Sequence, residues 1–321
     1  MPRKNKGREV SGILVLDKPS GLSSNQALQQ VKKLFFAQKA GHTGSLDPLA
    51  SGVLPICLGE ATKVSHFLLD ADKRYQATCQ FGILTTTGDS EGETLSIQAV
   101  PEYDEQSLSV ILNRFKGEQQ QIPPMYSALK YQGRPLYELA RQGKEVARKA
   151  RQIFIHDIKL LAVYEHSIDI EVHCSKGTYI RTLCEDIGNA LACGAHLTAL
   201  RRLASGPFTL QQSISLDELK NIHHKNRTAE GSLSAEGSSP AEGSKWRPLD
   251  NLLLAADAAI MVFPRVDIDE KEYGLIRQGQ AIEVSSLQSS EFYRLYYKNT
   301  LRALAVKDKS GRLTPKRLLF I

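Results

Sequence analysis

Apolar and polar residues alternate along this chain with two different periods, and each period predicts a different kind of element. Every second residue is apolar between Tyr75 and Phe81, as expected for a strand with one buried face. An apolar run over residues 12–17 ends at a Pro-Ser-Gly turn and predicts a short buried strand. Further strands are predicted at residues 153–164, 168–174 and 196–200.

Apolar positions three and four residues apart predict helices. Ser23 followed by Gln26 is typical of a capping box, and the residues after it place an apolar stripe on one helix face. That stripe consists of Leu28, Val31, Leu34 and Phe35. Further helices are predicted near residues 61–69, 106–115 and 180–194. Because helices and strands mix without regular βαβ alternation, the sequence predicts an α+β fold.

Several segments depart from these periods. Residues 85–92 predict a polar loop, and residues 119–151 predict an insertion, since they are rich in Gln, Arg, Lys and Tyr with little core periodicity. Residues 229–244 repeat AEGS three times and lack aromatic and β-branched residues, which predicts a mobile excursion. The composition changes at residues 261–265, and residues 294–297 and 301–306 after it are strand candidates.

The chain has a net charge of +6, and three of its segments are strongly basic. Residues 1–40 carry +6, and residues 128–151 and 299–321 carry +5 each. Separated basic segments suit a polyanionic partner, although basic termini also serve only to solubilise a protein. No run of about 18 apolar residues is present, so we expect no membrane span and a cytoplasmic location.

The cysteines and histidines form no recognisable framework. Five cysteines without CxxC spacing or a secretion signal argue against a disulfide framework, and packing is the expected role of Cys79 and Cys184. The eight histidines form no HExxH or CxxC/HxxxH array, so no metal is expected.

One loop carries the strongest indication of chemistry. The segment GHTGSLDPLASGVLPI, residues 41–56, holds a single carboxylate, Asp47, among glycines and prolines that fix the backbone. A lone Asp in a pinned apolar loop is a candidate nucleophile or general base. The alternative is that Asp47 caps the turn before Pro48, because Asp favours such positions.

This segment resembles the nucleophile motif of the TruB-type pseudouridine synthases, and further matches to that family occur in the family's order. They are GILVLDKPSGLSS (12–24), GEATK (59–63), DKRYQA (72–77), IPPMYSALKYQGRPLYELARQG (122–143), CSKGTYIRTL (174–183) and GAHLTALRRLASGPF (194–208). The resemblance implies a catalytic domain over residues 1–255, with a mixed, mainly antiparallel sheet flanked by helices and a thumb-like insertion at about 119–151. Residues 262–321 resemble a PUA domain, a small β-rich RNA-binding module.

The resemblance also implies a reaction. It is the isomerisation of uridine 55 in the T arm of tRNA, without a cofactor, after the base is flipped into a pocket. Asp47 is then the nucleophile, and Tyr75 offers a ring to stack on uracil and a hydroxyl near the sugar. Tyr179 and Arg181 would share one face of an extended backbone, which places Arg181 to hold Asp47 ionised and oriented. An exposed Arg in a weak surface ion pair is the alternative for Arg181.

Substrate contacts follow from the same resemblance. His42 takes the stacking space of the extruded nucleotide, Leu200 forms an apolar wall beside uracil, and Tyr75 and Tyr179 contact the base. Phosphate contacts are expected from basic residues in the matched motifs, namely Lys18, Lys63, Lys130, Arg201 and Arg202. Without the resemblance, His42 is a surface residue, and Tyr75 and Leu200 are core residues.

Other functions stay open. One is a guide-dependent synthase inside a ribonucleoprotein, against which the thumb-like insertion argues by resemblance. Another is a protein that folds or binds RNA with vestigial chemistry, and a third is a hydrolase that releases uracil. A tRNA-folding role could also accompany catalysis. The intact set of Asp47, Tyr75, Tyr179 and Arg181 argues against vestigial chemistry, and we expect a monomer that binds tRNA and requires no protein partner.

Overall fold

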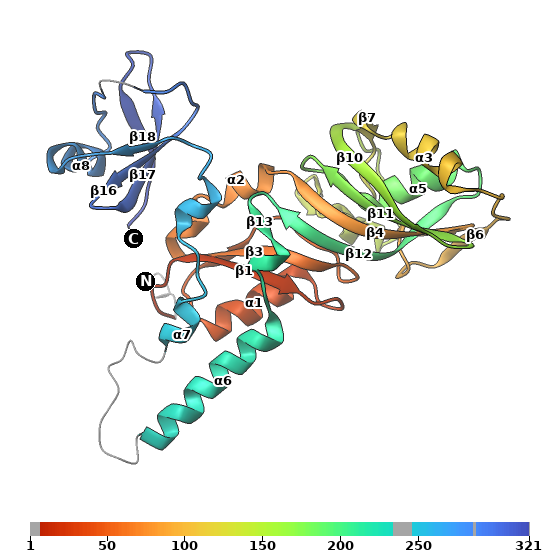
Figure 1. The fold of residues 1–321 in the computed structure, drawn as a ribbon, viewed down its shortest axis with the longest axis horizontal. Coiled ribbons are helices and arrows are strands. Elements are labelled where there is room, and N and C mark those ends of the chain that lie inside the picture. The colour runs from red at the N-terminus through yellow and green to blue at the C-terminus, as the bar shows by residue number, and fades with distance from the viewer. Residues whose placement is uncertain (1–6, 234–245, 285–286, 321) are drawn as a thin grey trace. The chain divides into compact units, whose positions relative to one another are not determined.

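The computed structural model describes residues 7–233, 246–284 and 287–320 (Figure 1). The chain forms two compact units. Unit 1 comprises Met1–Leu46, Leu54–Leu69 and Pro207–Ile321, and unit 2 comprises Asp47–Val53 and Asp70–Gly206. In the described part of the chain, no helix combines the length and apolar character needed to cross a membrane.

Unit 2 is built on a mainly antiparallel sheet with the strand order β3-β12-β4-β11-β10-β7. Its strands are β3 (Ser51–Leu58, shared with unit 1), β4 (Lys73–Phe81), β7 (Gly117–Gln121), β10 (Arg151–Val163), β11 (Ser167–Cys174) and β12 (Ala195–Ser205). Only the β3–β12 pair in this unit is parallel among the described pairings, so the predicted mixed, mainly antiparallel sheet is confirmed. A small ribbon joins β5 (Ile83–Thr85) to β6 (Thr94–Ile97).

Helices α3 (Glu105–Asn113) and α5 (Ile180–Ala190) pack on this sheet and on each other (Figure 1). Helix α5 buries Leu183 and Ile187, as the predicted apolar spacing requires. Strand β4 alternates between buried and more exposed residues along its whole length, which confirms the predicted half-buried strand. The buried residues of β4 and β11 therefore form a core beneath α5.

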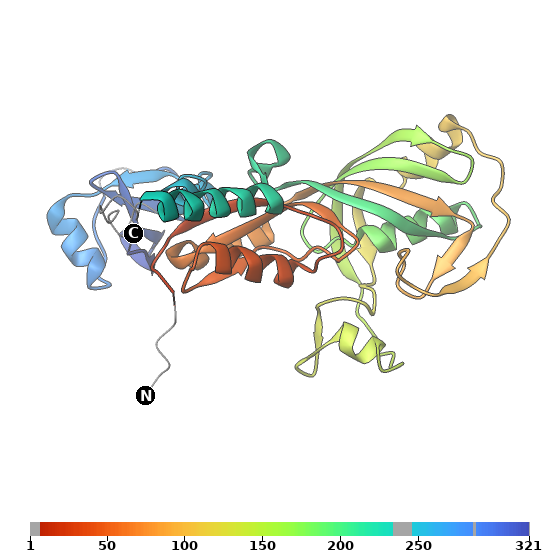
Figure 2. The same ribbon diagram turned by 90° about the horizontal axis from the view of Figure 1, so that it is seen from below.

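The insertion between β7 and β10 leaves the sheet as a separate excursion (Figure 2). It contains β8 (Lys130–Tyr131), β9 (Arg134–Pro135) and α4 (Leu136–Ala140). Residues 119–121, at the start of the insertion predicted at about 119–151, belong to β7 and pair with β10. A polar edge strand of sequence GEQQQ carries no apolar alternation, so the sequence pattern did not indicate it.

Outside the C-terminal sheet, unit 1 contains β1 (Gly12–Lys18), β2 (Ala40–His42), β14 (Ile214–Ser215) and the second half of β3. Helix α1 (Ser24–Leu34) begins with the predicted capping box, in which Ser23 and Gln26 hydrogen-bond reciprocally. The single helix predicted at 61–69 is instead a 3-10 turn, η1 (Gly59–Lys63), followed by α2 (Ser65–Asp70). Gly59, the first residue of this turn, has φ +53, and a Cβ at this position would lie 2.2 Å from the Val10 carbonyl oxygen.

The chain then runs through β13 (Phe208–Thr209) and η2 (Leu210–Gln212) into the long helix α6 (Leu216–Leu233). Residues 229–233 of the AEGS stretch belong to α6, so the predicted excursion does not begin at 229. Residues 234–244 of that stretch lie outside the described residues. Two short elements follow, α7 (Arg247–Asp250) and η5 (Ala256–Ala259).

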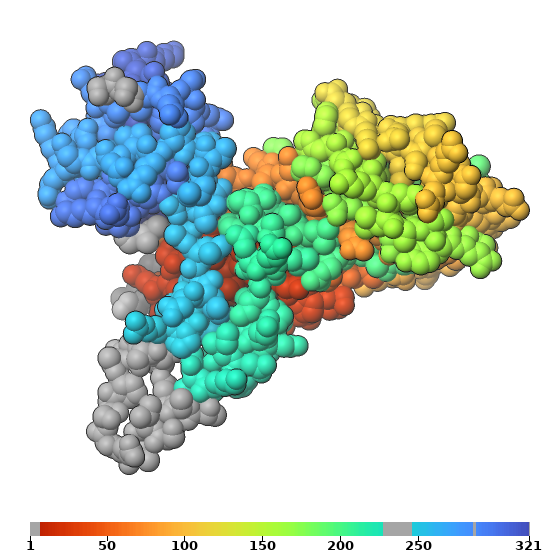
Figure 3. Space-filling model, viewed as in Figure 1, coloured from red at the N-terminus to blue at the C-terminus, as the bar shows by residue number. Residues whose placement is uncertain are grey.

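The C-terminal part of the chain forms a small four-stranded sheet with a core of its own. Its elements are β15 (Arg265–Asp267), α8 (Glu270–Arg277), β16 (Tyr293–Tyr297), β17 (Thr300–Lys307) and β18 (Leu313–Leu318). Ile276, Tyr293 and Leu295 are buried at its centre. The space-filling view shows this domain as a compact blue body, and it confirms the predicted β-rich C-terminal domain (Figure 3).

Candidate active site

The loop that carries Asp47 lies between β2 and β3, and hydrogen bonds hold it on both sides. The Leu46 N–H donates to the Ser24 hydroxyl oxygen at 2.7 Å, and that hydroxyl donates to the Leu46 carbonyl at 3.0 Å. The Ala50 N–H closes a turn on the Asp47 carbonyl at 3.1 Å. Ser24 is the first residue of α1, so the helix start anchors the residue before Asp47.

Gly52 fixes the exit of this loop into β3. Its φ is +105, and a Cβ at this position would lie 2.2 Å from the Arg202 carbonyl oxygen. Gly52 pairs with Arg202 in the parallel β3–β12 ladder. Only glycine permits both this conformation and this approach. Gly52 therefore allows the chain after Asp47 to enter β3 directly beside Arg202.

Arg181 lies beside Asp47 and is fixed on every side. Its Nε is 3.0 Å from Asp47 Oδ2 and 3.6 Å from Asp89 Oδ2. Nη1 donates to the Thr87 carbonyl and Nη2 to the Tyr126 carbonyl, both at 2.7 Å. The Arg181 side chain is only 6% exposed, whereas the Asp47 side chain is 44% exposed. A buried, immobile guanidinium therefore orients a carboxylate that solvent and substrate can reach.

The backbone that carries Arg181 differs from the prediction. Tyr179 has an extended conformation, but it is the N-cap residue of α5, and Arg181 is already the second residue of that helix. An extended path through residues 179–181 is therefore wrong. The helix starts at Ile180, which is buried, and Arg181 is buried beside it.

Two acidic residues near Arg181 were not identified from the sequence. Asp89 is 3% exposed and accepts hydrogen bonds from the Thr87 hydroxyl at 2.5 Å and the Glu91 N–H at 3.1 Å. Burial raises the pKa of Glu185, one helical turn beyond Arg181, to about 6. The Thr85–Gly92 stretch has the composition of an exposed loop, so no sequence signal indicated that one of its carboxylates is buried.

Tyr75 lies on the same sheet face as the residues opposite it on β12. It pairs with Arg202, and Ala77 pairs with Leu200, and directly opposed residues of an antiparallel pair share a face. Burial raises the pKa of the Tyr75 hydroxyl, and the Asp47 charge acts in the same direction. Leu200 is half-buried in this row. The structure thus places Tyr75 and Leu200 as neighbours and Tyr75 within the field of Asp47.

A buried lysine, Lys73, precedes Tyr75 by two residues on the same face of β4. Its ammonium group donates to the Ala71 carbonyl at 2.5 Å. Burial and the nearby Arg202 lower the pKa of Lys73 to about 8. The sequence interpretation did not single out this residue, because a lysine at the start of a strand is ordinarily solvated.

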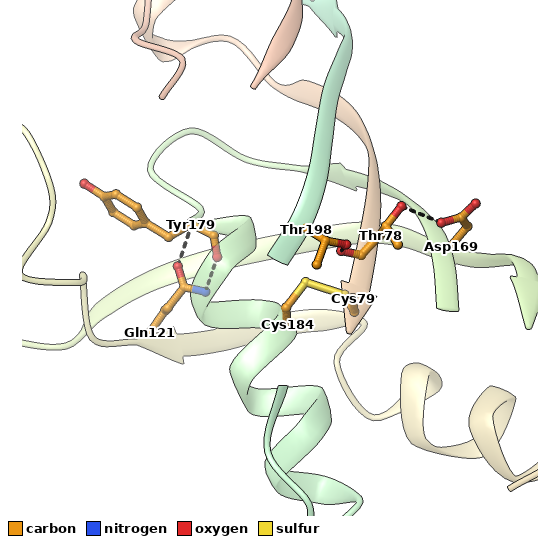
Figure 4. Close-up of a disulfide and its surroundings, with 7 residues drawn as sticks. All are labelled: Thr78, Cys79, Gln121, Asp169, Tyr179, Cys184 and Thr198. Carbon is orange, nitrogen blue, oxygen red and sulfur yellow. Dashed lines mark hydrogen bonds between the residues drawn. A yellow bond between two sulfur atoms is a disulfide. The ribbon is translucent and has the colours of Figure 1, made fainter. Parts of the chain in front are cut away.

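Tyr179 is held through its backbone by a side chain from β7 (Figure 4). The Gln121 amide donates to the Tyr179 carbonyl at 3.1 Å and accepts from the Tyr179 N–H at 2.8 Å. Gln121 is 4% exposed. This two-point contact fixes the start of α5. The sequence did not indicate this role, because Gln121 lies in a polar stretch that predicts an insertion.

Cys79 of β4 and Cys184 of α5 form a disulfide across this site, so the expectation that these cysteines only pack is wrong (Figure 4). They are 105 residues apart in sequence and carry no spacing signal, because the pairing depends on where α5 crosses the sheet. Cys184 lies one helical turn after Arg181, and Cys79 lies four residues after Tyr75. The bridge therefore joins the helix and the strand that carry two of the predicted catalytic residues.

Two of the predicted phosphate contacts, Lys18 and Lys63, lie in unit 1 and are engaged by the protein. Lys18 is fully buried and donates to the Pro19 carbonyl at 2.8 Å and the Leu22 carbonyl at 2.5 Å. Lys63 pairs with Glu60 at 2.7 Å and donates to the Leu318 carbonyl at 2.8 Å. These positions do not fit the predicted phosphate contacts, because both ammonium groups satisfy backbone carbonyls.

The remaining predicted contacts differ in exposure. His42 ends β2 and is half-buried, where it pairs with Ile56. Arg202 is 1% exposed and donates to the Val53 carbonyl at 2.6 Å, which does not fit a phosphate contact. Lys130 is exposed on the insertion, and Arg201 is half-buried.

The described residues also contain one group of potential metal ligands in unit 2. Asp72, His156 and His173 bring one ligand atom each to within 4.8 Å of one another. No sequence motif indicated this group, because its members come from three separate segments. It lies outside the Asp47 centre.

Comparisons with known proteins match successive parts of the chain to domains of one family. Residues 32–180 match the TruB family pseudouridylate synthase N-terminal domain, residues 181–261 the tRNA pseudouridylate synthase B C-terminal domain, and residues 264–319 the pseudouridine synthase II TruB C-terminal region. The chain is 48% identical over 319 residues to a tRNA pseudouridine synthase B of Nitrosococcus oceani, covering 99% of this chain and 97% of the relative. It is 47% identical over 321 residues to that of Chromobacterium violaceum, with the same coverage.

A solved structure supports the assignment at the level of the fold. A chain in the crystal structure of a Cbf5-Nop10-Gar1 complex superposes with a TM-score of 0.71 at 25% identity, covering 96% of this chain and 85% of that chain. The near full-length relatives, the three matched domains and the shared fold agree with one another. The chain therefore belongs to the TruB family of pseudouridylate synthases.

Proposed function

We propose that this enzyme isomerises uridine 55 in the T arm of tRNA, as a cytoplasmic monomer that needs neither a guide RNA nor a protein partner. The relatives that are 47–48% identical over nearly their full length are named tRNA pseudouridine synthase B, which supports a tRNA substrate. The observation that carries the proposal is the ion pair between the accessible Asp47 and the buried Arg181.

The reaction needs a nucleophile and no change of oxidation state. The N1–C1′ bond breaks and a C5–C1′ bond forms, while C5 loses a proton and N1 gains one. Asp47 supplies the nucleophilic carboxylate, since covalent catalysis divides one difficult step into two easier ones. Arg181 keeps Asp47 ionised and aimed, because both of its Nη groups are already fixed on backbone carbonyls.

Access to the base requires that the nucleotide leave its stack in the tRNA loop. Tyr75 then stacks on uracil, Leu200 closes one side, and Tyr179 contacts the base from the start of α5. His42 fills the space that the nucleotide leaves. Flipping costs a few kcal/mol of stacking, which these contacts offset.

RNA binding outside the pocket is assigned to exposed basic residues. Lys130 lies on the insertion, and Lys316 and Arg317 lie on β18 of the C-terminal domain. Each neutralised phosphate adds close to one unit to the magnitude of the salt slope, which is the slope of the logarithm of the binding constant against the logarithm of the salt concentration. Changing Lys316 and Arg317 together to Gln should therefore lower the salt slope of tRNA binding and leave the rate on bound tRNA unchanged.

The test uses Asp47→Asn and unmodified tRNA transcript, without any guide RNA. We expect wild-type enzyme to form pseudouridine at position 55 in single-turnover reactions, mapped chemically, and Asp47→Asn to bind the transcript but form none. Asp70→Asn is the matched control, since Asp70 is also a partly exposed carboxylate paired with a cation, Lys176, at 2.8 Å. Retained turnover in Asp47→Asn would leave only a turn-capping role for that residue.

The same reactions separate the other functions. A guide-dependent synthase would be inactive on the bare transcript, and an RNA-binding protein with vestigial chemistry would bind it without product. A hydrolase would release uracil and lower the RNA mass, whereas isomerisation leaves the mass unchanged.

A further inference from the structure

Two histidines and an aspartate meet on the face of the unit 2 sheet that points away from Tyr75. Arg74 and Tyr75 are adjacent in β4 and therefore point to opposite faces. His173 of β11 pairs with Arg74, so it shares the face opposite to Tyr75. His156 of β10 and Asp72, which precedes β4, complete the group.

A β-bulge brings the second histidine into the group. The β10–β11 register shifts between Ile155 and Asp157, so His156 is the extra residue on its strand. Bulges redirect side chains, and this one places the His156 ring 4.6 Å from the His173 ring, centroid to centroid. His156 Nε2 lies 3.0 Å from Asp72 Oδ2. The Gly206 N–H donates to the Asp72 carbonyl at 2.9 Å and holds that segment in place.

We propose that Asp72, His156 and His173 form a binding site for one divalent transition metal ion, with Zn²⁺ as the preferred biological occupant. Two imidazoles and one carboxylate are a common ligand set for Zn²⁺ in proteins. Tetrahedral coordination at about 2.1 Å requires ligand atoms roughly 3.4 Å apart. The three ligand atoms lie within 4.8 Å of one another, so they would move closer together on binding an ion.

The charged neighbours of this group form ion pairs of their own. Arg74 is turned toward Glu171, with Nη1 and Oε1 3.4 Å apart. Asp157 pairs with Lys116 at 3.0 Å and with Lys159 at 3.7 Å. Phe154 lies against the His156 ring, at 4.9 Å between centroids.

Metal binding here would join the start of β4 to β10 and β11. The ion would thus hold Asp72 in place immediately before Lys73 and three residues before Tyr75. Because the three ligands come from separate segments, the ion binds the folded chain and not the unfolded one, and it should raise the melting temperature. Asp72 and His156 are exposed, so solvent can reach the group.

The test is calorimetric titration of ZnCl₂ into untagged, chelator-treated full-length protein at neutral pH. We expect one Zn²⁺ per chain, and we expect His156→Gln and His173→Gln each to weaken binding by more than about tenfold. His166→Gln is the matched control, because His166 is an exposed histidine 3.8 Å from a carboxylate, Glu165, without a third ligand. It should bind Zn²⁺ like the wild type.

A second measurement keeps the proposal testable if a variant fails to fold. Co²⁺ bound to the wild type should show the visible absorption of nitrogen and oxygen ligands, without the near-ultraviolet thiolate band. Absence of binding, equal affinity in the His156→Gln and His173→Gln variants, or a thiolate band from Cys57, Cys174 or Cys193 would each overturn the assignment.

Discussion

Replacing Arg181 with Met separates the two roles of this guanidinium. The substitution removes the cation from the accessible Asp47 and from Asp89, which is 3% exposed. It also removes the donors to the Thr87 and Tyr126 carbonyls. Breaking a buried pair by deleting one partner costs about 3–5 kcal/mol, since an uncompensated charge remains. We expect a loss of that size in the free energy of unfolding, and most of it comes from Asp89.

The effect on catalysis has a different origin. A hydrogen bond to a charged group contributes about 1.5–3 kcal/mol. If the loss of this interaction with Asp47 raises the free energy of the transition state by that amount, the single-turnover rate falls by about 10- to 150-fold. Binding of tRNA should change little, because Arg181 is only 6% exposed.

The double variant Arg181→Met/Asp89→Asn distinguishes these effects. Neutralising Asp89 removes the unpaired buried charge, so the double variant should regain much of the stability lost by Arg181→Met. It should not regain activity, because Asp47 still lacks its cation. Urea unfolding and single-turnover assays on unmodified tRNA measure the two outcomes. A near-normal rate in the double variant would refute the catalytic pairing, and a stability loss that Asp89→Asn leaves unchanged would refute the role given to Asp89.

Three further substitutions test the surroundings of the site. Gly52→Ala should lower the free energy of unfolding in urea by about 3 kcal/mol or more, since its Cβ would lie 2.2 Å from the Arg202 carbonyl oxygen. Gly21→Ala is the control and should lower that free energy far less, because Gly21 has φ +81 but open space around it. Glu185→Gln should stabilise the protein by up to about 2 kcal/mol at pH 7 and not at pH 4. The pKa of Glu185 is raised from 4.5 to about 6, so the folded protein bears the cost of the ionised carboxylate only as the pH rises through that range. Equal effects at both pH values would contradict this. Cys184→Ala should lower the free energy of unfolding by about 2–4 kcal/mol, and a reductant should then lower the melting temperature of the wild type but not of the variant.

Local sequence determined the elements and the order of the motifs. The capping box at Ser23 and Gln26 and the alternation from Tyr75 to Phe81 appear in the structure as predicted. These features depend on contacts between residues a few positions apart, so a short stretch of sequence contains all the information they need. The isolated Asp47 in its pinned loop was evident for the same reason.

Only the tertiary structure decided which side chains are buried and what they contact. Asp89 and Gln121 have the composition of exposed loops and edges, yet they are buried against Arg181 and the start of α5. Lys18 resembled a phosphate contact but satisfies two carbonyls in the interior. Burial and pairing depend on which distant segments meet, and the crossing of α5 over β4 that joins Cys79 to Cys184 is set by the packing of the whole sheet.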